Sequence, residues 1–212
     1  MKRVLSLIIL FSLALCLVSC GGADDSDVLH KTGTLVTEET STGTSAAENI
    51  FVKGENSGKT YRSSFIGIGI TLNDEWTLFG EESLKGLTNS VTIFDMYALT
   101  GSGSSITVIF EDLTITGNAD MSSGEYAEKS APETVASLER LGYEINCSDA
   151  ESITVGGSAF DCITLSGTLS GSEVNIYEKL LCKKCGSYMA LITVGANTEE
   201  TVSDILSLFT KV

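Results

Sequence analysis

The sequence predicts an α+β domain in which helices flank an antiparallel β-sheet. Three observations support this fold class. Apolar residues alternate with small or polar ones in several short segments, as they do in half-buried strands. Clusters of Gly, Ser, Asn and Asp separate these segments, and two helix-capping patterns follow them. Strands with segregated helices are typical of the α+β class.

The first predicted strand covers residues 61–72. Its apolar residues at positions 66, 68, 70 and 72 alternate onto one face. Gly67 and Gly69 then fall on the opposite face, where we expect another element to pack closely. The remaining elements of this half are a short extended segment at 76–79, a short helix at 81–87, and a hairpin of strands 91–99 and 106–110 around a Gly-Ser loop.

A long helix is predicted after Ser122, because Ser122 and Glu125 have the spacing of a capping box. Apolar residues then recur at helical intervals until Gly142. Pro132 lies inside this pattern, where it removes a backbone hydrogen bond, so we expect a kink or a split near Ser130. A final helix begins near Asn197, with an apolar stripe that reaches Phe209.

Between these two helices the sequence predicts an antiparallel meander. Glycine-rich turns separate the apolar segments at regular intervals. The predicted strands are 144–147 or 152–155, then 159–166, 173–182 and 188–194.

The N-terminus has the three-part layout of an exported protein. Lys2 and Arg3 are followed by an uncharged apolar run, Val4 to Val18, and then by small residues. This run is shorter than the roughly 20 residues that a helix needs to cross a bilayer. The alternatives are a retained transmembrane helix and an ordinary signal peptide that leaves a soluble secreted protein.

The end of the apolar run, Leu17-Val18-Ser19-Cys20, resembles the lipobox of bacterial lipoprotein precursors. The resemblance implies cleavage between Ser19 and Cys20 and a lipid on the Cys20 thiol. The expected partner is therefore a membrane, and the expected location is the extracytoplasmic face of the cell membrane. Two or more acyl chains hold a protein stably at a bilayer.

Three regions follow from this interpretation. Residues 1–19 are a lipoprotein signal peptide, and residues 20–59 are the lipidated cysteine and a linker. The linker is rich in Gly, Ser, Thr, Asp and Glu and has the composition of a disordered segment. Residues 60–212 are the globular domain, which is long enough for one ordinary core.

Composition excludes one class of function. Without residues 1–20 the chain has 11 basic and 28 acidic residues, a net charge of about −17. Such a surface repels phosphate groups, so we expect no nucleic-acid partner.

Several segments resemble a known family. The stretch Tyr61-Arg62-Ser63-Ser64-Phe65-Ile66-Gly67-Ile68, followed by Trp76, is similar to the opening of PsbP-like domains. Residues 205–209 resemble that family's last helix. Residues 95–98 and 125–127 are similar to segments of uncharacterised lipoproteins of anaerobic Gram-positive bacteria. The resemblance covers about residues 60–212, implies an α/β/α sandwich around an antiparallel sheet, and transfers no functional residue.

Four cysteines lie in the domain, and Cys182-Lys183-Lys184-Cys185 is the only motif among them. The pair could be inert thiols or a structural disulfide, a reversible redox pair, or half of a zinc site completed by Cys147 and Cys162. The motif falls in a predicted hairpin turn, where the two lysines would favour thiolate. A redox role prefers a helix N-terminus.

No catalytic pattern is present. The predicted domain has no histidine, no metalloprotease or serine-hydrolase motif and no Walker loop. The adjacent acids Glu111 and Asp112 are typical of a solvated surface. We therefore expect no enzyme, no metal and no cofactor. The expected function is an accessory or binding module for an envelope protein or small molecule, the alternatives being an envelope thiol-disulfide protein using Cys182 and Cys185, or a purely structural component.

Overall fold

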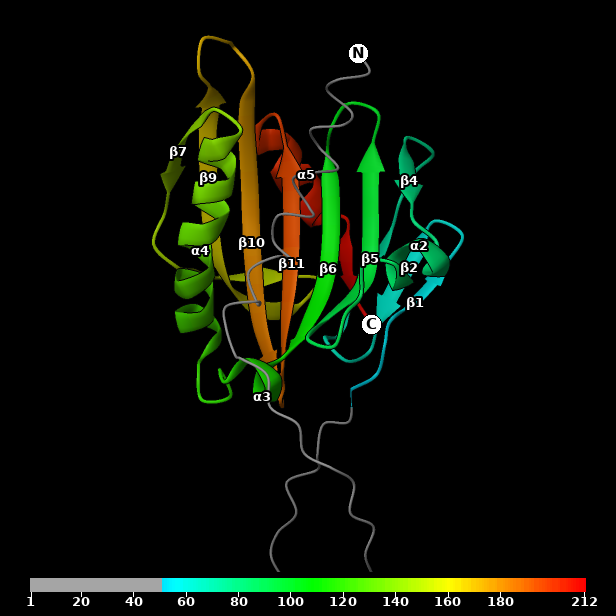
Figure 1. Ribbon diagram of the computed structural model, residues 1–212. Helices are drawn as coiled ribbons and strands as arrows, with labels where there is room; N and C mark the ends of the chain where they lie inside the picture. Colours follow the sequence, from blue (N-terminus) through cyan, green and yellow to red (C-terminus); the bar gives the residue numbers. More distant parts are fainter. Residues whose placement is uncertain (1–50) are drawn as a thin grey trace, which may run out of the picture.

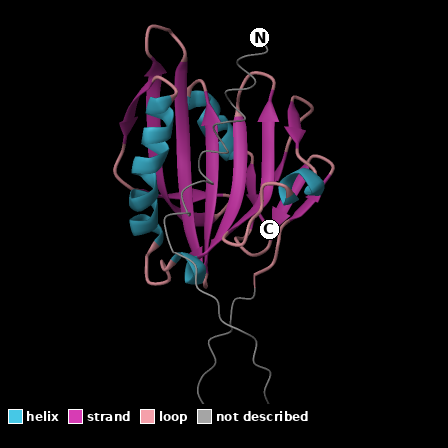
Figure 2. Ribbon diagram, in the orientation of Figure 1, coloured by secondary structure: helices cyan, strands magenta, loops and turns pink. Residues whose placement is uncertain are grey.

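The computed structural model describes residues 51–212, which form two antiparallel sheets and four helices (Figures 1 and 2). The large sheet has eight strands in the order β4-β5-β6-β11-β10-β9-β7, with β8 also paired to β9. Its strands are β4 (Trp76–Leu78), β5 (Thr92–Thr100), β6 (Ser105–Asp112), β7 (Tyr143–Cys147), β8 (Glu151–Val155), β9 (Ser158–Leu169), β10 (Asn175–Cys185) and β11 (Tyr188–Ala196).

The small sheet has four strands in the order β1-β2-β3-β12. They are β1 (Glu55–Ser57), β2 (Thr60–Ser63), β3 (Ile68–Thr71) and β12 (Phe209–Lys211). The last residues of the chain thus pair with a strand from the start of the domain, with Phe209 opposite Ile70.

Helices cover both faces of the large sheet, which confirms the predicted α+β class with an antiparallel sheet between helices. Figure 1 shows α4 (Ser123–Arg140) in front of β9 and α5 (Glu199–Ser207) behind the sheet. The small sheet shares the rear side with α5. Two short helices, α2 (Glu81–Lys85) and α3 (Leu113–Thr116), complete the domain.

Each face of the large sheet has its own hydrophobic core. The rear core joins the small sheet and α5 to the large sheet through residues such as Ile70, Phe110 and Val202. The front core joins α4 and α2 to the sheet through residues such as Leu84, Leu138 and Leu191. Side chains of a strand alternate between faces, so one sheet supplies both cores.

The long helix begins as the sequence predicts. Ser122 Oγ accepts a hydrogen bond from Glu125 N, and Glu125 Oε2 accepts one from Ser122 N, which forms the capping box. The predicted split near Ser130 is wrong, since α4 continues through Pro132 to Arg140. Packing of the helix against β7, β9 and β10 holds it together despite the lost backbone bond.

The first predicted strand is interrupted. Residues 61–72 form two strands, β2 and β3, joined by a turn in which Gly67 N donates to Ser63 O. Gly67 has a φ of +75°, so it belongs to the turn and not to a strand face. Gly69 does pack closely, because a Cβ there would lie 3.0 Å from Val212 and 3.1 Å from Tyr61 O.

Three further boundaries differ from the predictions. The strand β1 falls in the segment assigned to the linker, so the folded part begins before residue 60. Both alternatives for the first meander strand exist, as β7 and β8 on β9. The final helix ends before Phe209, which begins β12.

Within residues 51–212, none of the helices combines the length and the hydropathy needed to cross a membrane.

Candidate functional site

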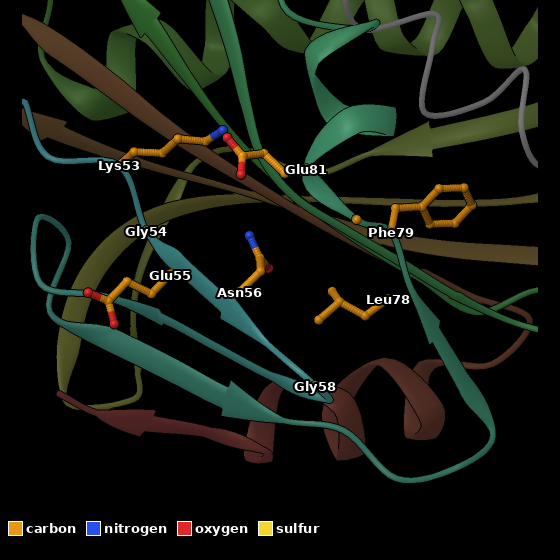
Figure 3. Close-up of a pocket in the computed structure, with 9 residues that line it drawn as sticks. Lys53, Gly54, Glu55, Asn56, Gly58, Leu78, Phe79 and Glu81 are labelled. Carbon is orange, nitrogen blue, oxygen red and sulfur yellow. The ribbon is translucent and has the colours of Figure 1, made fainter.

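A pocket of about 420 Å³ lies between β1 and the segment that joins β4 to α2 (Figure 3). Its wall is polar on one side and apolar on the other. The polar side includes Lys53, Asn56 and Glu81, and the apolar side includes Leu78 and Phe79. The remaining lining residues are Gly54, Glu55, Gly58 and Gly80.

The polar wall is held by the buried carboxylate of Asp95, a side chain with 0% exposure. Gly54 N donates to its two oxygens at 3.0 and 2.9 Å, and the Tyr61 hydroxyl donates to Oδ2 at 2.7 Å. Asn56 Nδ2 also donates to the Asp95 carbonyl at 2.8 Å. Asp95 lies at an irregularity of β5 between Phe94 and Met96.

Gly54 is required at its position. A Cβ there would lie 2.5 Å from Tyr61 Cε2 and 2.6 Å from Asp95 Oδ2. The absence of a side chain lets the backbone approach the carboxylate closely enough to donate to it. The wall of the pocket is thus fixed by backbone contacts that no other residue type would allow.

Burial dominates the titration of this group. It raises the pKa of Asp95, while the hydrogen bonds from Tyr61 and Gly54 and the charge of Lys53 partly oppose the rise. The pKa of Tyr61 is raised by burial and by the Asp95 charge. These shifts describe a structural hydrogen-bond network, since two donors, Gly54 N and the Tyr61 hydroxyl, already face the carboxylate.

The pocket has the groups to bind a ligand. Figure 3 shows the Lys53 and Glu81 side chains extending toward the same side of the pocket, with Asn56 beneath them. A charged pair and an amide can bind a polar group, and Leu78 can contact an apolar one. The Phe79 ring points away from these side chains, toward Tyr97. Its lining residues include no cysteine, serine or histidine that could act as a nucleophile or base.

An aromatic cluster lies where the described part of the chain begins. Phe51 stacks on Tyr188 with ring centroids 4.7 Å apart, and contacts Phe65 and Phe110 edge-on at 5.3 and 5.1 Å. Such contacts stabilise a fold beyond the area that they bury. They hold the start of the domain against the end of the large sheet.

The two cysteines of the Cys-x-x-Cys motif do not lie in a turn. Both belong to β10, three residues apart, so their side chains point to opposite faces of the sheet. Cys182 is part of the front core and Cys185 of the rear core, and both thiols are free. The structure therefore separates the pair that a redox role would need to bring together.

Burial outweighs the neighbouring lysines in its effect on the pKa of these thiols. Burial raises the pKa of Cys182, and it raises the pKa of Cys185 against a weaker opposing effect of Lys183. Lys183 Nζ donates to Ile66 O, and Lys184 Nζ donates to Met121 O. Lys183 thus acts on Cys185 in the predicted direction, but burial outweighs it, and both thiols of this strand have a raised pKa.

The other two thiols do not complete a metal site. Cys147 is exposed, and Cys162 is buried on the rear face, where burial raises its pKa to about 11. In the described range, 51–212, no three His, Cys, Asp or Glu residues are grouped so that they could hold a metal ion.

Sequence reasoning missed the roles of two acidic residues. Glu111 accepts a hydrogen bond from the Tyr126 hydroxyl, and burial raises its pKa. Asp112 caps α3 by accepting a hydrogen bond from Thr114 N at 2.9 Å. The two acids therefore serve different elements, and the interpretation of a simple solvated surface is wrong for Glu111. Strand alternation through residue 112 would have indicated this difference.

Cys20 lies outside the described residues, so its lipidation stays a prediction.

No protein-family model matches the chain, and no curated protein matches it in sequence. Among solved structures it is similar to cyanobacterial PsbP (CyanoP) from Synechocystis sp. PCC 6803, with 11% identity, a TM-score of 0.46, and 81% of this chain and 99% of that chain covered.

Two further solved structures are similar at comparable levels. LpqN, which is involved in cell envelope biogenesis of Mycobacterium tuberculosis, has 15% identity and a TM-score of 0.36, covering 68% of this chain and 82% of that one. A protein from Bacteroides thetaiotaomicron has 9% identity and a TM-score of 0.38, covering 73% of this chain and 48% of that one.

Proposed function

We propose that the protein is a lipid-anchored accessory module on the extracytoplasmic face of the cell membrane. The observation that carries this proposal is Leu17-Val18-Ser19-Cys20 at the end of a short apolar run with Lys2 and Arg3 before it. The acidic balance of the rest of the chain repels anionic headgroups, so the lipid holds the protein at the membrane.

The anchor is tested with two cysteine variants. Cys20→Ser removes the only thiol at the expected cleavage site, so metabolic labelling with palmitate should be lost and the protein should leave the membrane fraction or remain as precursor. Cys16→Ser is the matched control, because Cys16 lies in the same run and is removed with the signal peptide. Full labelling and membrane retention of Cys20→Ser would disprove the lipid anchor.

The binding function of the module is proposed for the pocket beside Asp95. The pocket combines a fixed backbone wall with Lys53 and Glu81, so it can recognise a polar segment of an envelope protein or a small molecule. The positions of Cys182 and Cys185 on opposite faces do not favour the redox alternative.

The docking function is tested by affinity capture of the lipidated protein from detergent-solubilised membranes. A stoichiometric partner should be recovered with the unaltered protein and lost with the double variant Lys53→Ala, Glu81→Ala. Lys211→Ala, an exposed change in the small sheet, is the control. Equal recovery with the double variant would show that the pocket is not the docking site.

A further inference from the structure

Glu178 is a buried carboxyl group without a hydrogen-bond partner. Its side chain in the middle of β10 is 1% exposed, and neither oxygen has a partner within the described part of the chain. Burial alone raises its pKa to about 8. Buried polar side chains in proteins are nearly always paired, so this group requires an explanation.

The strand pattern shows that Glu178 replaces an apolar residue. Ile176, Leu180 and Cys182 alternate with it on the front face, and all three pack in the front core. A leucine at position 178 would continue this pattern. A carboxyl group there destabilises the fold unless something outside the described residues donates to it.

The side chains next to Glu178 on this face are small and polar. Gly195 lies directly opposite it on β11, and Ser105 lies opposite Gly195 on β6. In the next row of the sheet Thr193 and Thr107 are paired in the same way. We call these four residues the polar strip; three of them are buried polar side chains.

The polar strip ends where large side chains begin. One row further along, Cys182, Leu191, Ile109 and Phe94 follow one another across the sheet and fill the front core. Small side chains fill less of the layer above a sheet than these do. A Cβ on Gly195 would lie 3.3 Å from Ser105 Oγ. The Ser105 hydroxyl therefore lies close to the Gly195 backbone on the neighbouring strand.

The helices of the front face lie to either side of the polar strip. α4 contacts β7, β9 and β10, and α2 contacts β5. α3 contacts β6 and β11, and Figure 1 shows it at the end of these strands away from the polar strip. Beyond the strip on β5, the Tyr97 ring contacts Phe79 in a tilted arrangement, with centroids 4.7 Å apart. The buried Tyr97 hydroxyl also lacks a partner among residues 51–212.

The charged groups of the neighbouring elements are engaged elsewhere. On β10, Lys179 points to the rear face and donates to Thr164 Oγ1. Lys184, six residues after Glu178, donates to Met121 O. On β9, Asp161 lies opposite Cys182, and on α4, Arg140 bonds Ala136 O and Ser137 Oγ. The front-facing residues of β11 in this part of the sheet carry no charge.

We propose that Glu178 and the polar strip bind a small organic cation, a primary amine on a compact apolar body. The ammonium group has three donors, which suit a carboxylate with two free oxygens and the hydroxyls of Ser105 and Thr193. Leu165 and Leu180, the buried neighbours of Glu178 on this face, make its surroundings apolar and so favour an amine with an apolar body. This site is separate from the pocket beside Asp95.

The chemistry of Glu178 gives the binding a characteristic pH dependence. Below about pH 8 the empty site holds a proton on Glu178, and this proton goes to solvent when an ammonium group binds. The affinity should therefore rise by about tenfold per pH unit up to about pH 8 and level off until the amine itself deprotonates near pH 10.

The test uses cyclohexylmethylamine and its isosteric alcohol, cyclohexylmethanol. Each is titrated calorimetrically into the full-length protein in nanodiscs between pH 6 and pH 9, with empty nanodiscs as the blank. We expect the amine to bind with the pH dependence above and the alcohol to bind at least about tenfold more weakly. Glu178→Gln should weaken amine binding by at least about tenfold and abolish its pH dependence, while Glu128→Gln, an exposed change on α4, should leave both unchanged.

Three results would overturn the proposal. These are no amine binding at any pH, equal binding of amine and alcohol, and amine binding to Glu178→Gln with unchanged affinity and pH dependence. The Glu178→Gln protein must show the native circular dichroism spectrum for the comparison to count. Glu178→Leu is a second variant with an apolar replacement, which keeps the apolar alternation of the strand and should also lose amine binding.

Discussion

Two buried carboxyl groups of the large sheet differ in their hydrogen bonding. Asp95 on β5 accepts hydrogen bonds from two groups of the small sheet and its N-terminal extension, Gly54 N and the Tyr61 hydroxyl. Glu178 on β10 has no partner among the described residues. Both are essentially inaccessible to water, so the difference lies in their neighbours and not in their exposure.

This difference separates a structural role from a binding role. Removing Asp95 leaves donors without an acceptor, whereas removing Glu178 leaves nothing unpaired. Deleting one partner of a buried pair costs far more than replacing an unpaired group with an apolar one. Asp95 therefore stabilises the fold, whereas Glu178 lowers its stability, as residues of binding sites often do.

The largest expected effect is the pH dependence of the unfolding free energy that Glu178 causes. Its pKa is about 4.3 in an unfolded chain and about 8 in the fold. The folded state therefore binds a proton more tightly, so the stabilisation by that proton is complete below about pH 4 and is lost as the pH rises to about 8. Relative to Glu178→Gln, the unaltered protein should lose up to about 5 kcal/mol of unfolding free energy over this window.

Urea denaturation at intervals between pH 4.5 and pH 8 measures this loss. The difference between the two proteins isolates Glu178, because Asp95 and Glu111 titrate in both. A constant difference across the range would mean that Glu178 is not buried as a lone acid.

The second largest effect is expected for the paired carboxylate. Asp95→Ala leaves Gly54 N and the Tyr61 hydroxyl unpaired, so the unfolding free energy should fall by about 3 to 4 kcal/mol. Amide hydrogen exchange of Gly54 should accelerate with it. Asp74→Ala, at an exposed turn, should change neither quantity, and a loss for Asp95→Ala no larger than that for Asp74→Ala would contradict the structural role.

The sequence predicted the elements that depend on local signals. The capping box of Ser122 and Glu125, the hairpin around residues 100–104 and the alternation of the meander strands all appear as expected. Each of these signals acts over a few residues, which is why one sequence is enough to recognise it. The continuity of α4 through Pro132 depended on packing against the sheet, and no local signal indicates that packing.

The candidate sites required long-range information. Asp95 meets Gly54 across 41 residues, and the polar strip gathers residues from β6, β10 and β11. Even so, two signals were present. Extending the strand 173–182 by three residues would have placed Cys182 and Cys185 on opposite faces, and Glu178 interrupts an otherwise apolar face of that strand.

The smallest expected loss of stability is for a substitution of Gly54, the glycine whose backbone N–H donates to Asp95. Gly54→Ala would place a Cβ 2.5 Å from the Tyr61 ring and 2.6 Å from Asp95 Oδ2, both of which are buried and cannot move freely. Overpacking of this kind costs about 2 to 3 kcal/mol, measured as a lower midpoint in the same urea titration. Gly80→Ala is the matched control on the opposite wall of the pocket, since a Cβ there meets nothing within 4 Å. Because the clash acts through Asp95, the cost should shrink in an Asp95→Ala background, and equal costs in the two backgrounds would show that Gly54 and Asp95 are not coupled.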